Sequence, residues 1–255
     1  MIENSHAEAP PVNPGTNRDH GGPVSVPIDL CHVSIEEGYE LWAPSYDLAP
    51  NPLLALEARE LKPRFPNLKG RYVLDVACGT GRWLEGLLSR GARSGVGVDL
   101  SSAMLAVATA KATLRGRLVR ADCLSLPFRS ELADLMVCSF ALAHLRGLAA
   151  FAGELSRLAK RGADIFVTDL HPQAYAAGWR SAFRHSRGVV EIPAFVRPVE
   201  QVLWTFATCG FELLECVESN FSEPEKQIFS DAKKPDLFEQ VRHVPAVLIC
   251  HFARS

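Results

Sequence analysis

Two glycines and two acidic residues have the types and the spacing that a nucleoside site requires. Gly79 and Gly81 form a tight turn after an apolar stretch that contains Asp75. Asp99 lies 18 positions after Gly81, at the end of the next apolar stretch. Glycine lets a ligand approach the backbone closely, and the first turn of a following helix offers unpaired N–H donors. Because a carboxylate at the end of the second strand accepts hydrogen bonds from a ribose diol, the pattern predicts a nucleoside-binding turn.

Two details bear on which nucleoside the turn would hold. The dinucleotide fingerprint requires a third glycine, and Leu84 occupies that position here. Asp75 lies within the strand just before the turn, where its charge would repel a pyrophosphate and tolerate a cation. S-adenosylmethionine carries a sulfonium and an ammonium group, so the carboxylate suits this molecule.

The segments around these residues alternate between apolar strands and helices, which is typical of a parallel sheet covered on both faces. We expect strands at 72–77, 95–99, 118–121, 133–140, 164–169, 211–217 and 245–252, and helices at 35–42, 53–61, 82–90, 102–113, 148–160, 199–209 and 235–242. The predicted fold is a doubly wound α/β domain with a mostly parallel, seven-stranded Rossmann-like sheet and a small helical lid. The two terminal strands are expected to pair in antiparallel or crossover fashion.

Changes in composition divide the chain into five parts. Residues 1–30 are rich in Pro, Gly, Asn and His and lack an apolar period, which predicts a disordered tail. Residues 31–70 would form helices that cover the site, and residues 71–170 the cofactor-binding half of the domain. Residues 171–197 interrupt the alternation and would form a substrate lid, before the C-terminal half at 198–255.

Four segments carry a resemblance to a known family. Val73–Gly81 resembles the first motif of class I S-adenosylmethionine-dependent methyltransferases, and Gly97–Leu105 is similar to their second. Arg120–Phe128 and Asp134–Phe140 resemble the third and fourth motifs. The likeness is greatest to the small-molecule branch that includes ubiquinone- and menaquinone-biosynthesis enzymes. It implies S-adenosylmethionine as cofactor and methyl transfer to the oxygen, nitrogen or carbon atom of a small acceptor.

The resemblance also implies a set of cofactor-binding residues. Asp75 would support the glycine loop, Asp99 would hold the ribose hydroxyls, and Asp122 would accept from the adenine amino group. Tyr46 resembles an N-terminal tyrosine that closes over the cofactor in several relatives. The full set is Tyr46, Asp75, Ala77, Gly79, Gly81, Asp99, Leu100, Met104, Asp122, Cys123, Ser139 and Phe140.

The acceptor would bind beyond the fourth and fifth strands. His144 and His171 follow those strands and titrate near neutral pH, so each is a candidate catalytic base or a loop histidine bonded to backbone. A base is needed only if the acceptor must lose a proton. The candidate substrate-binding residues in the lid are Trp179, Arg180, Phe183 and Arg184. Simple packing of the aromatic residues and a solvated arginine face remain the alternatives.

Composition excludes several classes of function. The net charge of −2 gives no basic field for nucleic acid, and no apolar run is long enough to span a membrane. The cysteines are odd in number and form no C-x-x-C motif, which indicates reduced thiols in a cytoplasmic protein without a metal site. A nicotinamide-dependent oxidoreductase and a non-catalytic S-adenosylmethionine-binding regulator remain alternatives, and the oligomeric state is open.

Overall fold

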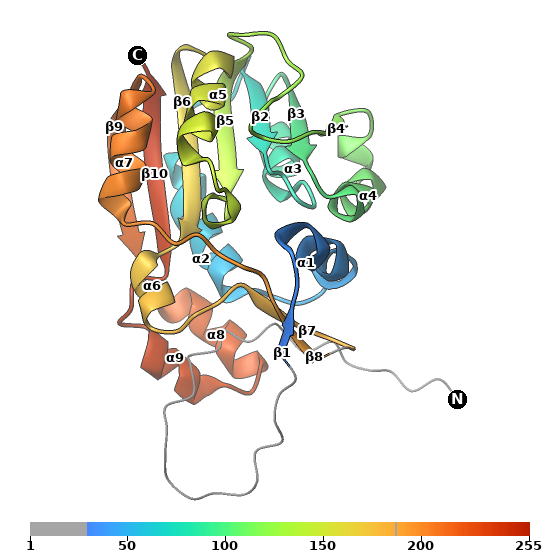
Figure 1. Cartoon of the computed structure of the whole chain (residues 1–255), viewed down its shortest axis with the longest axis vertical. Coiled ribbons are helices and arrows are strands. Elements are labelled where there is room, and N and C mark those ends of the chain that lie inside the picture. Colours follow the sequence, from blue (N-terminus) through green and yellow to red (C-terminus); the bar gives the residue numbers. More distant parts are fainter. Residues whose placement is uncertain (1–29, 187) are drawn as a thin grey trace, which may run out of the picture.

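A seven-stranded sheet forms the centre of the computed structural model, which describes residues 30–186 and 188–255 (Figure 1). The strands lie in the order β4-β3-β2-β5-β6-β10-β9, and β10 runs antiparallel to both of its neighbours. Their bounds are β2 Tyr72–Val76, β3 Ser94–Asp99, β4 Leu118–Arg120, β5 Ala133–Ser139, β6 Ala159–Leu170, β9 Phe211–Ser219 and β10 Val247–Arg254. The predicted doubly wound, mostly parallel sheet is confirmed, and the terminal strands pair in antiparallel fashion. The predicted disordered tail lies outside the described residues, except for its last position.

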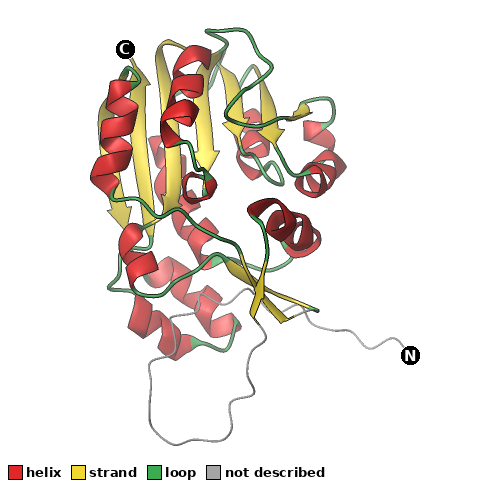
Figure 2. Cartoon of the chain, in the orientation of Figure 1, coloured by secondary structure: helices red, strands yellow, loops and turns green. Residues whose placement is uncertain are grey.

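Helices cover both faces of this sheet (Figure 2). They are α2 Pro52–Leu61, α3 Arg82–Ser89, α4 Ser102–Ala110, α5 Leu148–Leu158 and α7 Val199–Thr208. Successive residues of a strand point to opposite faces, so Leu135 packs in one core cluster and Met136 in the other. Both faces being buried explains why the central strands are continuously apolar. No helix in the described part of the chain is long and apolar enough to cross a bilayer.

A cover lies beyond the carboxyl ends of the parallel strands (Figure 1). It contains α1 Ile35–Trp42, α6 Pro172–Ala176 and a small sheet of β1 Leu30–His32, β7 Ala182–His185 and β8 Gly188–Glu191. Residues 171–197, which were predicted to form a substrate lid, contain α6 and the strands β7 and β8 of this cover. β8 pairs with β1 as well as with β7, and Phe183 and Val190 bury their side chains in a cluster with Val33. This pairing with a distant segment is what the local sequence could not show.

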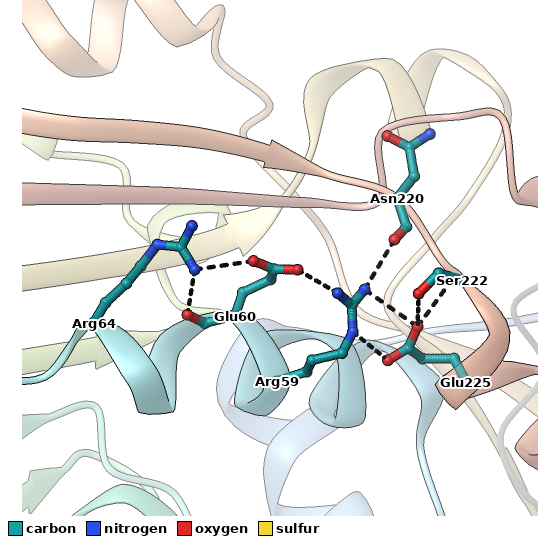
Figure 3. Close-up of polar contacts among 6 residues, drawn as sticks. All are labelled: Arg59, Glu60, Arg64, Asn220, Ser222 and Glu225. Atoms are coloured by element: carbon teal, nitrogen blue, oxygen red, sulfur yellow. Dashed lines mark hydrogen bonds and ion pairs between the residues drawn. The ribbon is translucent and has the colours of Figure 1, made fainter.

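The connection between β9 and β10 is a helical hairpin, α8 Glu223–Asp231 and α9 Pro235–Val241. The sequence predicted α9 and missed α8. Ser222 and Glu225 form a capping box at the start of α8, which is the signal that was available. The hairpin is tied to α2 because the Nε atom of Arg59 donates to Glu225 at 2.9 Å (Figure 3). Nη2 of Arg59 also donates to the Asn220 carbonyl at 3.3 Å, so the polar face of α2 is anchored to this connection at two points.

Candidate active site

The turn between β2 and α3 has a backbone shaped to receive a ligand. Ala77, Gly79 and Gly81 all have positive φ angles, of 55°, 53° and 78°. A Cβ atom at Gly79 would meet nothing within 4 Å, so this side of the turn is open. At Gly81 a Cβ would lie 2.3 Å from Cδ1 of Leu114, so close packing as well as the φ angle requires glycine.

Two carboxylates accept hydrogen bonds from this turn and from the start of α3. Oδ2 of Asp75 accepts the Leu84 N–H at 2.8 Å, and Oδ2 of Asp99 accepts the Gly79 N–H at 2.7 Å. Burial raises the pKa of Asp75 to about 7 and also raises the pKa of Asp99. Each carboxylate oxygen can accept more than one hydrogen bond, so Asp99 retains capacity for a ligand. Two acidic groups beside an open turn fit a cationic nucleoside such as S-adenosylmethionine and disfavour a pyrophosphate.

The other residues predicted to contact adenosine differ in their placement. Leu100 is 47% exposed beside the turn and presents a free apolar surface. Met104, which could belong either to the core or to the adenine site, is buried, and this placement fits core packing. Asp122 is exposed and accepts the Leu124 N–H at 2.9 Å, while Cys123 is half-buried.

A buried glutamate on α2, which the sequence analysis did not single out, lies at the centre of a polar network. Glu57 is completely buried and forms an ion pair with Arg82. Its other donors are the Trp83 Nε1–H at 3.2 Å, the Ser139 hydroxyl at 2.7 Å and the Thr168 hydroxyl. The network joins α2 to the start of α3 and to β5 and β6. Leu53 and Leu61 lie four positions to either side of Glu57 on an apolar helix face, which was the available signal.

A cavity of about 660 Å³, part of it the open mouth, lies at the carboxyl ends of β5 and β6. Asp169, from the end of β6, is the carboxylate in its wall, and Arg180 lies on its rim. The remaining surface is largely aromatic, formed by Tyr39, Trp42, Tyr46, Phe140 and Trp179. The aromatic rings of this wall suit a planar ligand.

Of the four lid residues predicted to bind substrate, two line this cavity. Trp179 does so while stacking on Phe221 with ring centroids 5.7 Å apart. Arg180 does so with its Nε 3.6 Å from Glu191. Phe183 is instead buried and stacks on Trp42, with centroids 4.9 Å apart.

Arg184, the fourth lid residue, is exposed on β7 and does not line this cavity. Its side chain fits the alternative interpretation of a solvated face. The two predicted substrate residues on β7 are thus part of the cover's own packing and surface.

His144 and His171 occupy different surroundings. Nδ1 of His144 donates to the Pro193 carbonyl at 2.9 Å, which leaves Nε2 as an acceptor, and burial lowers the pKa of this ring. The ring packs edge-on against Tyr39 with centroids 5.3 Å apart. His171 is buried, accepts the Gln173 N–H through Nδ1 and donates through Nε2 to Glu218 at 2.7 Å. Because Nδ1 caps α6 and Nε2 is bound to Glu218 of β9, both ring nitrogens are engaged, and the geometry supports the structural interpretation of His171.

Several known proteins are similar to this chain. A family model described as a methyltransferase domain matches residues 73–162. The ubiquinone biosynthesis O-methyltransferase of Hahella chejuensis is 29% identical over 193 residues, which cover 69% of this chain and 75% of that protein. The protein of the same name from Pseudomonas paraeruginosa is 30% identical over 161 residues, which cover 59% of this chain and 68% of that one.

Solved structures agree in fold. An S-adenosylmethionine-dependent methyltransferase from Mesorhizobium loti has a TM-score of 0.64 at 22% identity, covering 80% of this chain and all of that one. One from Aquifex aeolicus has a TM-score of 0.54 at 17% identity, covering 82% and 96% of the two chains. These findings favour neither the nicotinamide-dependent oxidoreductase nor the non-catalytic binding protein. With its strand–turn–helix motif and its sheet, the chain belongs to the class I S-adenosylmethionine-dependent methyltransferases.

Proposed function

We propose that this enzyme methylates a hydroxyl oxygen of a small, planar acceptor bound in the aromatic cavity. The observation that carries this proposal is the position of the cavity, whose Phe140 wall directly follows the β5 residue Ser139. S-adenosylmethionine supplies an electrophilic methyl group on a good leaving group. The protein therefore contributes mainly by aligning the acceptor and excluding water, which is worth roughly 7 to 11 kcal/mol in well-oriented reactions.

We infer the cofactor contacts from the turn and its neighbours. Asp99 accepts the ribose hydroxyls, and Leu100 packs against adenine. The backbone at Ala77, Gly79 and Gly81 lies against the ribose and the methionine portion, with Asp75 supporting the loop. The remaining proposed contacts are Asp122 and Cys123 at the adenine end and Tyr46, Ser139 and Phe140 at the methyl end.

The acceptor contacts follow from the cavity wall. Trp179 and Trp42 provide faces for a planar ring, and Arg180 on the rim would pair with an anionic substituent of the acceptor. His144 contacts the cavity through Tyr39, so we assign it the role of orienting that tyrosine.

The choice of oxygen rests on the relatives, several of which are named ubiquinone biosynthesis O-methyltransferases. The cavity is too small for a macromolecule to enter, which supports a small-molecule acceptor and not a nucleic acid. All seven cysteines are free thiols, which supports action in the reducing cytoplasm.

Calorimetry followed by an acceptor screen tests this function. The purified protein is titrated with S-adenosylmethionine, S-adenosylhomocysteine and NADH, and we expect the first two to bind and NADH not to bind. It is then incubated with S-adenosylmethionine and matched phenols, amines and carbon acids, and S-adenosylhomocysteine formation is measured. We expect turnover of phenols. Turnover of amines alone would reassign the acceptor atom, and no turnover of any class would support a non-catalytic protein.

A further inference from the structure

We propose that Asp169 is the base of this enzyme, taking the acceptor's hydroxyl proton in the aromatic cavity and releasing it through a second cavity behind the carboxylate. The inference rests on the proposed function, because a base is required only for an acceptor that loses a proton. Neither histidine candidate lies in the wall of the aromatic cavity, whereas Asp169 does.

Asp169 is held in one orientation by the backbone. It lies near the end of β6 and is 7% exposed. Its Oδ1 accepts the Leu170 N–H at 2.7 Å, and its Oδ2 accepts the Ala143 N–H at 2.5 Å. Each oxygen keeps a second lone pair, so a carboxylate fixed in this way can still accept a proton from a neighbouring hydroxyl.

A second cavity also borders the carboxylate of Asp169. It has a volume of about 310 Å³, and it shares Asp169 and Leu170 with the aromatic cavity. Its lining also includes Arg197 and Phe195. Asp169 thus lies between the space for the acceptor and a separate opening. A base that takes a proton from the acceptor on one side and releases it on the other requires this position.

The charged and titratable groups facing Asp169 leave it without a counter-ion. Arg197 is the cation near it, but this guanidinium donates to carbonyl oxygens of the 142–146 segment and Phe195. Among the described residues Asp169 forms no ion pair. The other groups facing it are Glu57, Tyr39, Tyr175 and Cys138. Burial accordingly raises the pKa of Asp169 to about 7, where a carboxylate is basic enough to accept a phenolic proton.

The proton balance of the step is simple. The acceptor oxygen forms its bond to the methyl carbon while the electron pair of the breaking S–C bond returns to sulfur. The O–H bond breaks and its proton goes to a carboxylate oxygen of Asp169, which is left neutral. That proton then leaves to solvent through the second cavity, and the carboxylate is restored.

The variant Asp169→Asn tests this role, with Asp164→Asn as the matched control. Asp164 lies on the same strand about 16 Å away, where it pairs with Arg71 and His251 outside the site. With a phenol from the screen, we expect Asp169→Asn to lower kcat by about 10²- to 10⁴-fold and to remove the fall in kcat below neutral pH. Its affinity for S-adenosylhomocysteine should be unchanged. Asp164→Asn should keep the wild-type kcat and pH profile and lose only stability.

A second measurement needs no acceptor. Infrared titration of the wild type should show carboxyl groups that stay protonated up to near-neutral pH, and Asp169→Asn should lose one of them. A wild-type kcat in Asp169→Asn, or an unchanged infrared titration, overturns the proposal. So does turnover restricted to amines, which leaves the methyltransferase function intact and removes the need for a base. Absence of turnover with every acceptor class removes the proposed function and the base together.

Discussion

At the residue scale, several carboxylates around the site are buried and depend on hydrogen bonds or ion pairs from neighbouring groups. Glu57 is the most enclosed of them, since four side chains donate to it and none of its surface is exposed. We expect Glu57→Gln to lower the free energy of unfolding by about 3 to 5 kcal/mol, because Arg82 would lose its buried partner. Urea denaturation measures this. Glu60→Gln, on the same helix but on its polar face, should cost no more than about 1 kcal/mol. Equal effects of the two variants would contradict a special role for the network.

Asp99 carries a separate prediction, about binding. If Asp99 accepts the ribose hydroxyls as proposed, Asp99→Ala removes these charge-assisted hydrogen bonds, so we expect S-adenosylmethionine affinity to fall by about 1.5 to 3 kcal/mol, or roughly 10- to 150-fold. Calorimetric titration measures the change, and the melting temperature of the variant checks that it is folded. Unchanged affinity in a folded variant would show that the ribose binds elsewhere.

At the element scale, α1 is held over the site by close packing against the small sheet. Gly38 lies inside α1, and a Cβ there would come within 2.7 Å of Cγ1 of Ile192. Gly86 lies inside α3, where a Cβ would meet nothing within 4 Å. We expect Gly38→Ala to lower the free energy of unfolding by about 1 to 3 kcal/mol and Gly86→Ala to raise it by about 0.5 to 1 kcal/mol. Urea denaturation of both variants measures the two signs, and stabilisation by Gly38→Ala would mean that α1 packs loosely.

Whether an element depends on local or on distant contacts explains which elements could be predicted from the sequence. The central strands and α2, with Asn51 as its cap and Pro52 in its first turn, follow from local patterns of apolar residues and caps. The lid strand β8 does not, because its partner β1 lies more than 150 positions away in the chain, and β7 joins this small sheet only through its pairing with β8. Helix α8 was missed because its buried face holds only Phe229 and a glutamate, Glu225, whose partner Arg59 is equally distant.

At the scale of the whole molecule, the turn that we propose for the cofactor was predictable from the sequence, and the cavity that we propose for the acceptor was only partly so. The turn is one contiguous motif, whereas the cavity combines α1, α2, β6 and the lid. Asp169 looked like the end of an ordinary strand, and only the fold reveals that it separates two cavities. Glu57 and Arg82 lie 25 positions apart and become an ion pair only when α2 packs beside α3.

The buried carboxylate of Asp75 should also make the free energy of unfolding of the whole molecule depend on pH. The pKa of Asp75 rises from 3.8 to about 7 on folding, so between these pH values the native state binds more protons than the unfolded state. Stability due to this group is therefore fully present below pH about 4 and is lost as pH rises towards 7. His144 acts in the opposite sense, because burial lowers its pKa and the unfolded state then binds the extra proton.

Comparison of the wild type with Asp75→Asn isolates the carboxylate from the histidine, since His144 contributes equally to both. We expect the variant to gain stability relative to the wild type by up to about 1.4 kcal/mol per pH unit between pH 4 and 7, with a constant difference outside that window. Urea denaturation at a series of pH values measures the two curves. Parallel curves across the window would show that Asp75 ionises as readily in the folded protein as in the unfolded chain, and the turn would then rest on an ordinary, solvated carboxylate.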